Sequence, residues 1–269
     1  YSIPDRYRIF AVWAVVNDIR LPDWDVFNDT PVRRIRGKHE SLSRERALRE
    51  SVPDWLDQMA AESLGESLWE EELRALNQEA PVVLRTNTLK TDPETLRKVL
   101  SEEGIETSPV PSCPTALQLD KRANVFRTPA FRNGWFEVQD ASSQKVVPML
   151  GVAPGMRVVD CCAGAGGKTL HLAAEMENKG QIIAMDLYEG KLAELKRRAR
   201  RAGAFNIETR LITSQKTIKR LRGSADRLLI DAPCSGLGVL RRNPDAKWKL
   251  QPEFIENLCR TQQEILSAY

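Results

Sequence analysis

The second half of the chain alternates short apolar runs with amphipathic stretches. The apolar runs cover residues 157–160, 181–186, 207–212 and 225–231. Helical spacing of apolar residues covers 138–150, 169–177 and 190–202. Strands that alternate with helices predict an α/β fold built on a parallel, doubly wound sheet. We therefore expect one α/β domain over residues 131–269.

The first half of the chain has a different pattern. Residues 1–80 carry apolar positions at helical spacing, for instance at 44–48 and 55–59, and predict a helical N-terminal region. Residues 81–130 begin with a strand-like run and continue with a helix that Asp92-Pro93 opens and Gly104 closes. We expect this second segment to form a small α/β accessory domain, in which the prolines after residue 108 mark a loop.

Composition excludes several classes of protein. A chain of 269 residues with 42% hydrophobic and 29% charged residues can fill a full-sized core. No apolar run approaches the roughly 20 residues that a membrane span needs, and no secretory leader is visible. Five cysteines without a CxxC pair, and only two histidines, argue against disulfides and against a metal site. We expect a cytoplasmic protein with no membrane partner and no metal, acting as a monomer.

The charge of the chain is unevenly distributed. Residues 190–249 contain sixteen Lys or Arg and five Asp or Glu, a surplus of eleven positive charges in a chain whose net charge is +3. Such a region is typical of a face that binds a polyanion such as RNA. A solvated helix surface would have the same composition, so charge alone leaves both interpretations open.

A glycine-rich loop follows the first predicted strand of the α/β domain. The stretch DCCAGAGGKT (160–169) joins that strand to a helix, and such loops let a ligand approach the backbone closely. The phosphate-binding Walker pattern fails because its first glycine falls on Cys162, and a dinucleotide pattern fails at Thr169. The remaining candidate ligand is S-adenosylmethionine, an adenosine with an amino-acid tail.

The residues predicted to hold this cofactor come from two strand ends. Asp186 ends the second strand and is expected to accept hydrogen bonds from the ribose hydroxyls, the alternative being a capping acid. Cys161 is interpreted as packing under the loop. The predicted contacts from the loop are Asp160, Cys162, Ala163, Gly164, Ala165, Gly166, Gly167 and Lys168.

Three motifs together resemble a known enzyme family. QDASSQ (139–144), DCCAGAGGKT (160–169) and DAPCSGLGVLRRNPDAKW (231–248) are similar to the RsmB/NSUN type of RNA cytosine-5 methyltransferases. The resemblance implies a Rossmann-like domain that uses S-adenosylmethionine over 131–269. It also implies that 81–130 form the ferredoxin- or RRM-like domain that precedes the catalytic domain in this family.

The resemblance implies covalent catalysis by two cysteines. A thiolate adds to carbon 6 of cytosine and makes carbon 5 able to attack a methyl group. Asp231 would stabilise the charge on the ring nitrogen, and Cys234 would assist release of the product. The attacking cysteine is expected in a later Thr-Cys motif, so we expect the chain up to Tyr269 to bind cofactor without turnover. Cys259, in a helix-like stretch, is interpreted as packing.

The resemblance also suggests further contacts. Lys168 would contact the methionine carboxylate or the catalytic aspartate, or else cap the local backbone. Thr213 stands where the family has an acid that contacts adenine, and could hydrogen-bond there more weakly. Arg241, Arg242 and Lys247 are predicted to contact RNA phosphates, which position RNA without reading its sequence.

The sequence therefore predicts an RNA cytosine-5 methyltransferase that acts on ribosomal RNA, with transfer RNA as the other candidate substrate. The target cytosine must be unpaired or extruded. A non-catalytic RNA-binding module with a vestigial cofactor fold is the first alternative, and a nucleotide hydrolase is the second.

Overall fold

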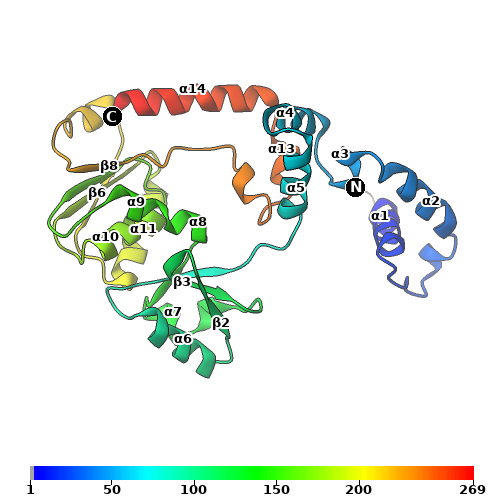
Figure 1. Cartoon of the computed structure of the whole chain (residues 1–269), viewed down its shortest axis with the longest axis horizontal. Helices are drawn as coiled ribbons and strands as arrows, with labels where there is room; N and C mark the ends of the chain where they lie inside the picture. Colours follow the sequence, from blue (N-terminus) through cyan, green and yellow to red (C-terminus); the bar gives the residue numbers. More distant parts are fainter. Residues whose placement is uncertain (1–2) are drawn as a thin grey trace. The chain divides into compact units, whose positions relative to one another are not determined.

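The computed structural model describes the backbone of residues 3–269 and the side chains of residues 5–269. The chain divides into two compact units (Figure 1). One unit combines the chain up to Glu79 with Gly236–Pro252, and the other combines Ala80–Ser235 with Glu253–Tyr269. The segment Gly236–Pro252, which we expected in the α/β domain, thus groups with the N-terminal helices.

The first unit is helical, as the spacing of its apolar residues predicted. Its helices are α1 (Ile3–Val16), α2 (Val32–Leu42), α3 (Arg46–Arg49), α4 (Asp54–Leu64), α5 (Glu66–Leu76) and α13 (Ala246–Lys249), with 3-10 turns η1 (Asp25–Phe27) and η3 (Leu237–Val239). Leu56 of α4 packs against Trp69 and Leu73 of α5 in a small core. Asp57 joins the same two helices, because it accepts a hydrogen bond from the Trp69 indole at 2.7 Å.

The second unit begins with an antiparallel sheet of order β2-β3-β1-β4. Its strands are β1 (Val83–Thr86), β2 (Thr107–Val110), β3 (Cys113–Leu119) and β4 (Phe136–Val138). Helix α6 (Pro93–Glu102) covers it and starts at Asp92, whose carboxylate accepts from the Thr95 N–H at 2.9 Å. The predicted proline loop is wrong in part: Pro111 stands in a turn, but Pro109 lies in β2 and Pro114 in β3, which form a hairpin. Pro109 is tolerated because β2 is an outer strand with one partner, and Pro114 precedes the part of β3 that pairs with β1.

The small sheet extends past residue 130. Strand β4 pairs with β1, so it belongs to this sheet although we expected residues 131–269 to form the next domain. The 3-10 turn η2 (Val125–Arg127) and helix α7 (Pro129–Arg132) lead into β4. The continuous helix expected over 138–150 is also wrong: two short helices, α8 (Ala141–Gln144) and α9 (Val146–Leu150), stand there instead.

The second sheet of this unit has the order β7-β6-β5-β8, and all three strand pairs are parallel. Its strands are β5 (Arg157–Asp160), β6 (Gln181–Asp186), β7 (Ile207–Leu211) and β8 (Arg227–Leu229). The helices beside it are α10 (Gly167–Glu175), α11 (Glu189–Ala202), α12 (Gln215–Lys219) and α14 (Pro252–Ala268). This confirms the doubly wound α/β fold that the alternating pattern predicted.

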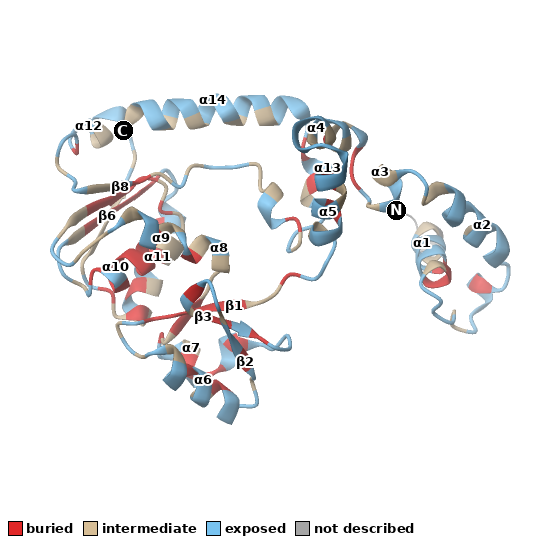
Figure 2. Ribbon diagram, viewed as in Figure 1, coloured by how far each residue is buried: buried red, intermediate tan, exposed pale blue. Residues whose placement is uncertain are grey.

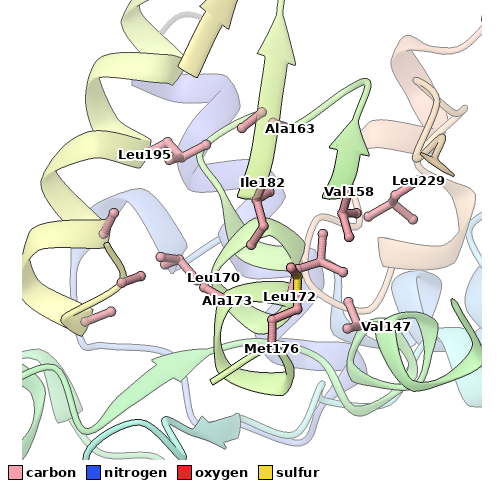
Figure 3. Close-up of a cluster of buried hydrophobic side chains, with 14 of the residues drawn as sticks. Val147, Val158, Ala163, Leu170, Leu172, Ala173, Met176, Ile182, Leu195 and Leu229 are labelled. Atoms are coloured by element: carbon pink, nitrogen blue, oxygen red, sulfur yellow. The ribbon is translucent and has the colours of Figure 1, made fainter. Parts of the chain in front are cut away.

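Alternate residues of the central strands face opposite sides of this sheet. Val158 and Ile182 pack against Leu172 and other residues of α9, α10 and α11 (Figure 3). Val159 and Ile183 belong to a second cluster on the other face. Strands buried on both faces read as continuous apolar runs, which is why the sequence identified them (Figure 2). None of the helices in the described part of the chain could cross a membrane.

Candidate cofactor and catalytic site

The glycine loop after β5 is held in a conformation that requires glycine. Gly164 and Gly166 have φ values of 54° and 88°, in the left-handed region. A Cβ on Gly166 would lie 2.6 Å from the Leu195 Cγ, so α11 packs directly against the loop. Asp186, at the end of β6, accepts from the Gly164 N–H and from the Tyr188 N–H, both at 2.9 Å. The end of β6 therefore holds the glycine loop that follows β5.

A cavity of about 490 Å³ opens at the carboxyl ends of these strands. Of the residues predicted from sequence, Cys162, Gly164, Asp186 and Asp231 line it. Its other walls come from Cys161, Leu187, Tyr188, Lys191, Ile212, Gln215, Ile218, Pro233, Glu264, Ile265, Ala268 and Tyr269. The size suits a small-molecule ligand, and apolar walls with a few polar groups are typical of such sites.

Asp160 lies outside the lining of this cavity. Its side chain is buried, and its Oδ2 accepts a hydrogen bond from the Thr169 hydroxyl at 2.7 Å. Burial raises the pKa of Asp160 to about 6. The carboxyl thus ties β5 to the first turn of α10, and a contact of Asp160 with the cofactor stays a prediction.

The catalytic candidates Asp231 and Lys168 form an ion pair. The Lys168 Nζ lies 2.5 Å from the Asp231 Oδ2, and the Asp231 side chain keeps 49% of its surface exposed. Lys168 was predicted to contact the methionine carboxylate or the catalytic aspartate, or to cap the local backbone. The structure supports its contact with the aspartate, Asp231. Cys234 lies three residues further on and is exposed. Gln262 of α14 donates to the Pro233 carbonyl at 2.8 Å and so holds the segment between the acid and the thiol.

Other predicted contacts fall outside the cavity walls. Thr213 is exposed, and its hydroxyl lies 3.5 Å from the Thr217 hydroxyl. The cavity wall nearest to it in sequence is instead formed by Ile212 and Gln215. Ala163, Ala165, Gly166 and Gly167 shape the loop without lining the cavity.

The sequence analysis missed Tyr188 and Gln215 as wall residues. The signal that could have found Tyr188 is its position two residues after Asp186, where the chain leaves a strand end. Burial raises the pKa of Cys162 to about 11, so this wall residue presents a thiol rather than a thiolate. It is therefore unsuited to attack a base.

The three predicted RNA contacts lie in the helical unit. Arg241 donates to the Glu79 carbonyl at 2.8 Å. Lys247 is buried and its Nζ lies 3.5 Å from the Glu50 carbonyl, which leaves it little surface for a phosphate. Arg242 is exposed. The structure thus uses Arg241 and Lys247 to attach the basic loop to the N-terminal helices.

Part of the basic surplus is neutralised inside the second unit. Glu137 of β4 is buried and forms ion pairs with Arg198, at 2.9 Å, and with Arg201 of α11. The Arg201 guanidinium also lies 4.0 Å from the centre of the Phe131 ring. Arg198 and Arg201 therefore stabilise the fold through these contacts. Neither of the two interpretations of the basic region, a solvated helix surface or a face that binds RNA, applies to them.

The cysteines are all free. Cys161 is buried in the second apolar cluster, as its predicted packing role requires, but it also lines the cavity. Cys259 is exposed on α14, so the packing interpretation of Cys259 is wrong. Within residues 3–269, no group of three potential ligands from His, Cys, Asp and Glu could hold a metal ion.

Comparison with known proteins identifies two matching family models. The model described as 16S rRNA methyltransferase RsmB/F matches residues 147–269. The model described as the ferredoxin-like domain of RsmF/B-like methyltransferases matches residues 52–126.

Individual relatives agree with these matches. The probable ribosomal RNA small subunit methyltransferase B of Synechocystis is 36% identical over 81% of this chain and 49% of its own length. The corresponding enzyme of Citrobacter koseri is 33% identical over 88% of this chain and 56% of its own length. A methyltransferase homologue from Pyrococcus horikoshii superposes with a TM-score of 0.64 and 31% identity, over 72% of this chain and 64% of that one. The chain spans about half the length of the curated relatives it matches.

Proposed function

Because the chain belongs to the RsmB/F family of ribosomal RNA methyltransferases, we propose that the complete protein methylates carbon 5 of a cytosine in ribosomal RNA. The methyl donor is S-adenosylmethionine. The observation that supports this proposal is the ion pair between Asp231 and Lys168. Asp231 lines the same cavity as Asp186, and Cys234 follows it by three positions in the chain.

The cavity walls fit this donor. The Asp186 oxygens each accept one backbone N–H and retain a second lone pair for a ribose hydroxyl. Gly164 leaves open space where a side chain would stand, so a ligand can approach the backbone. Ile212 and Ile218 provide apolar surface for a flat ring, and Gln215 provides an amide beside it. When bound there, S-adenosylmethionine supplies an electrophilic methyl group.

The protein's own groups have separate roles in this proposal. Addition of a thiolate to carbon 6 of cytosine shifts an electron pair toward ring nitrogen 3, and Asp231 in its carboxylic acid form would supply the proton that this nitrogen takes up. The resulting nucleophilic carbon 5 takes the methyl group, then loses its proton, and elimination of the thiolate restores the ring. Lys168 holds Asp231 in place. The family resemblance assigns release to Cys234 and attack to a cysteine in a Thr-Cys motif, which the printed sequence does not contain.

The substrate is an RNA segment in which the target cytosine is unpaired or extruded, because carbon 5 must reach the cavity. The test compares 5-methylcytosine at each position of total RNA from cells with and without the intact gene. We expect one ribosomal RNA position to lose its methyl group. RNA binding by the complete protein without any methyl transfer would instead favour a non-catalytic module.

The role of Cys234 has a direct test in the complete protein. If Cys234 assists release, Cys234→Ala accumulates a covalent protein–RNA adduct that survives denaturing electrophoresis. Cys259→Ala is the matched control, since Cys259 is also an exposed thiol of the same unit. Equal adduct levels in the two variants would contradict the role of Cys234.

A further inference from the structure

The antiparallel sheet contacts the glycine loop through a buried arginine. Arg85 of β1 is 2% exposed, and its Nη1 donates to the Gly167 carbonyl at 2.6 Å. The same nitrogen donates to the Gln139 side-chain oxygen at 2.6 Å, which fixes the direction of the guanidinium. A residue 82 positions away in sequence therefore holds the end of the loop.

A second arginine holds the same loop two residues earlier. The Arg198 Nη1 of α11 donates to the Ala165 carbonyl at 2.8 Å. Its other nitrogens donate to Glu137 of β4, which is 3% exposed. The antiparallel sheet thus orients Arg198 as well, through its last strand.

Together with Asp186, these contacts fix the loop at three nearby peptide units. Asp186 accepts from the Gly164 N–H, and the two arginines donate to the Ala165 and Gly167 carbonyls. Because a peptide unit is planar, a fixed carbonyl also fixes the direction of the next N–H. The arginines therefore set the orientation of the peptide units that lead into Lys168.

The position of Arg85 is costly by ordinary standards. Burial lowers the pKa of Arg85 to about 10, so the side chain stays charged at neutral pH without contact with water. It also lies at the N-terminus of α10, where the helix dipole disfavours a cation. Apolar residues often replace buried charges without loss of stability. A purely stabilising role would thus not require an arginine at this position.

We propose that Arg85 and Arg198 are positioning residues for the loop that binds the methyl donor, so that the antiparallel sheet sets the affinity of the site for S-adenosylmethionine. This inference rests on the proposed function. Gln139 and Glu137 belong to the same arrangement, because each orients one of the two arginines.

The same interface offers a matched control away from the loop. The Lys90 Nζ donates to the Arg201 carbonyl at 2.7 Å, near the C-terminus of α11. Asn87 donates to the Ala202 carbonyl at 2.8 Å. Both contacts join the antiparallel sheet to α11, and a lysine suits the negative end of a helix. Lys90→Met removes a cation from the interface without touching the loop.

The experiment measures the dissociation constant of S-adenosylmethionine by calorimetry in the complete protein. We expect Arg85→Met and Arg198→Met each to weaken binding roughly tenfold, and Lys90→Met to change it less than about twofold. The methyl-transfer rate at saturating donor should also fall, but by less than the affinity, because the loop leads into Lys168, the partner of Asp231. Arg85→Lys and Arg198→Lys should restore part of the affinity, because one donor and the charge remain.

Several outcomes would overturn this inference. The first is that Lys90→Met weakens donor binding as much as Arg85→Met does, with both losses of affinity in proportion to the losses of thermal stability. The second is that both arginine variants bind the donor as tightly as the wild type. If the arginine variants do not fold, Gln139→Ala decides the matter. We expect it to fold with a moderate loss of thermal stability, because one acceptor of a buried guanidinium is removed, and to weaken donor binding more than Lys90→Met does. Unaltered binding would refute the role of Arg85. Failure of the proposed function is distinguishable, since the wild-type protein would then not bind the donor.

Discussion

We expect Asp186 to be the residue on which donor binding depends most directly. Asp186 is 7% exposed, and its carboxylate accepts hydrogen bonds from the N–H groups of Gly164 and Tyr188, so Asp186→Asn replaces one acceptor oxygen by an NH2 group. One backbone N–H then faces a donor, which costs about 1–3 kcal/mol of folding stability. We expect the variant also to lose the proposed charge-assisted hydrogen bond to a ribose hydroxyl. At about 2 kcal/mol, that loss weakens S-adenosylmethionine binding roughly 30-fold.

Calorimetry of the complete protein with S-adenosylmethionine measures this effect, and urea unfolding measures the stability loss separately. Asp226→Asn is the matched control. Asp226 also accepts a backbone N–H, from Arg157 at 2.7 Å, but it precedes β8 and so lies at the amino end of the sheet. We expect this control to lose stability and to retain full donor affinity.

The reasoning about Asp186 fails if Asp186→Asn binds the donor as tightly as the wild type. It fails equally if Asp226→Asn weakens binding to the same extent, since the effect would then follow from general destabilisation of the sheet. A folded, stable variant with intact affinity would show that the ribose contact lies elsewhere.

Two further predictions concern stability. Burial raises the pKa of Asp160 to about 6, above the ordinary value, so this carboxyl binds a proton on folding and its contribution to stability falls as pH rises from about 4 to 6. Asp160→Asn should remove that fall. The gain in urea-unfolding free energy over wild type should then be about 2 kcal/mol larger at pH 7.5 than at pH 4; an equal difference at both pH values would contradict this. Gly166→Ala should destabilise by about 3 kcal/mol, from left-handed strain and the clash with Leu195, whereas Gly151→Ala, with φ of 61° and no neighbour within 4 Å, should cost about 1 kcal/mol. Similar unfolding free energies for the two glycine variants would refute the close approach of α11 to the loop.

Elements with a strong local signal could be predicted from the sequence. Strands β5 and β6 are buried on both faces, so their apolar runs stand out, and Asp186 could be placed at a strand end. The glycine loop was identified because its conformation demands glycine. The proline-marked hairpin of β2 and β3 was missed because an outer strand tolerates residues that read as loop.

The contacts between distant segments could not be predicted in this way. Glu137 pairs with arginines more than 60 positions away, and no local pattern distinguishes such a pair from solvated charges. The same holds for Lys247, which is buried and lies against the Glu50 carbonyl, 197 positions away. Counting basic residues in the sequence therefore overestimates the positive charge on the surface, because some of these side chains are buried or paired with buried acids.

Three carboxylates lie at or just beyond the carboxyl ends of adjacent parallel strands, and their surroundings separate their chemistry. Asp160 is buried with a raised pKa, so it is poorly placed to hold a charge near a ligand. Each carboxylate oxygen of Asp186 accepts a hydrogen bond from a backbone N–H, so only the remaining lone pairs can accept from hydroxyl groups. Asp231 combines an exposed carboxylate with a lysine partner. Of these three acids it alone combines an exposed carboxyl group in the cavity wall with a side-chain partner that positions it, and the proposed chemistry at the cytosine ring therefore centres on it.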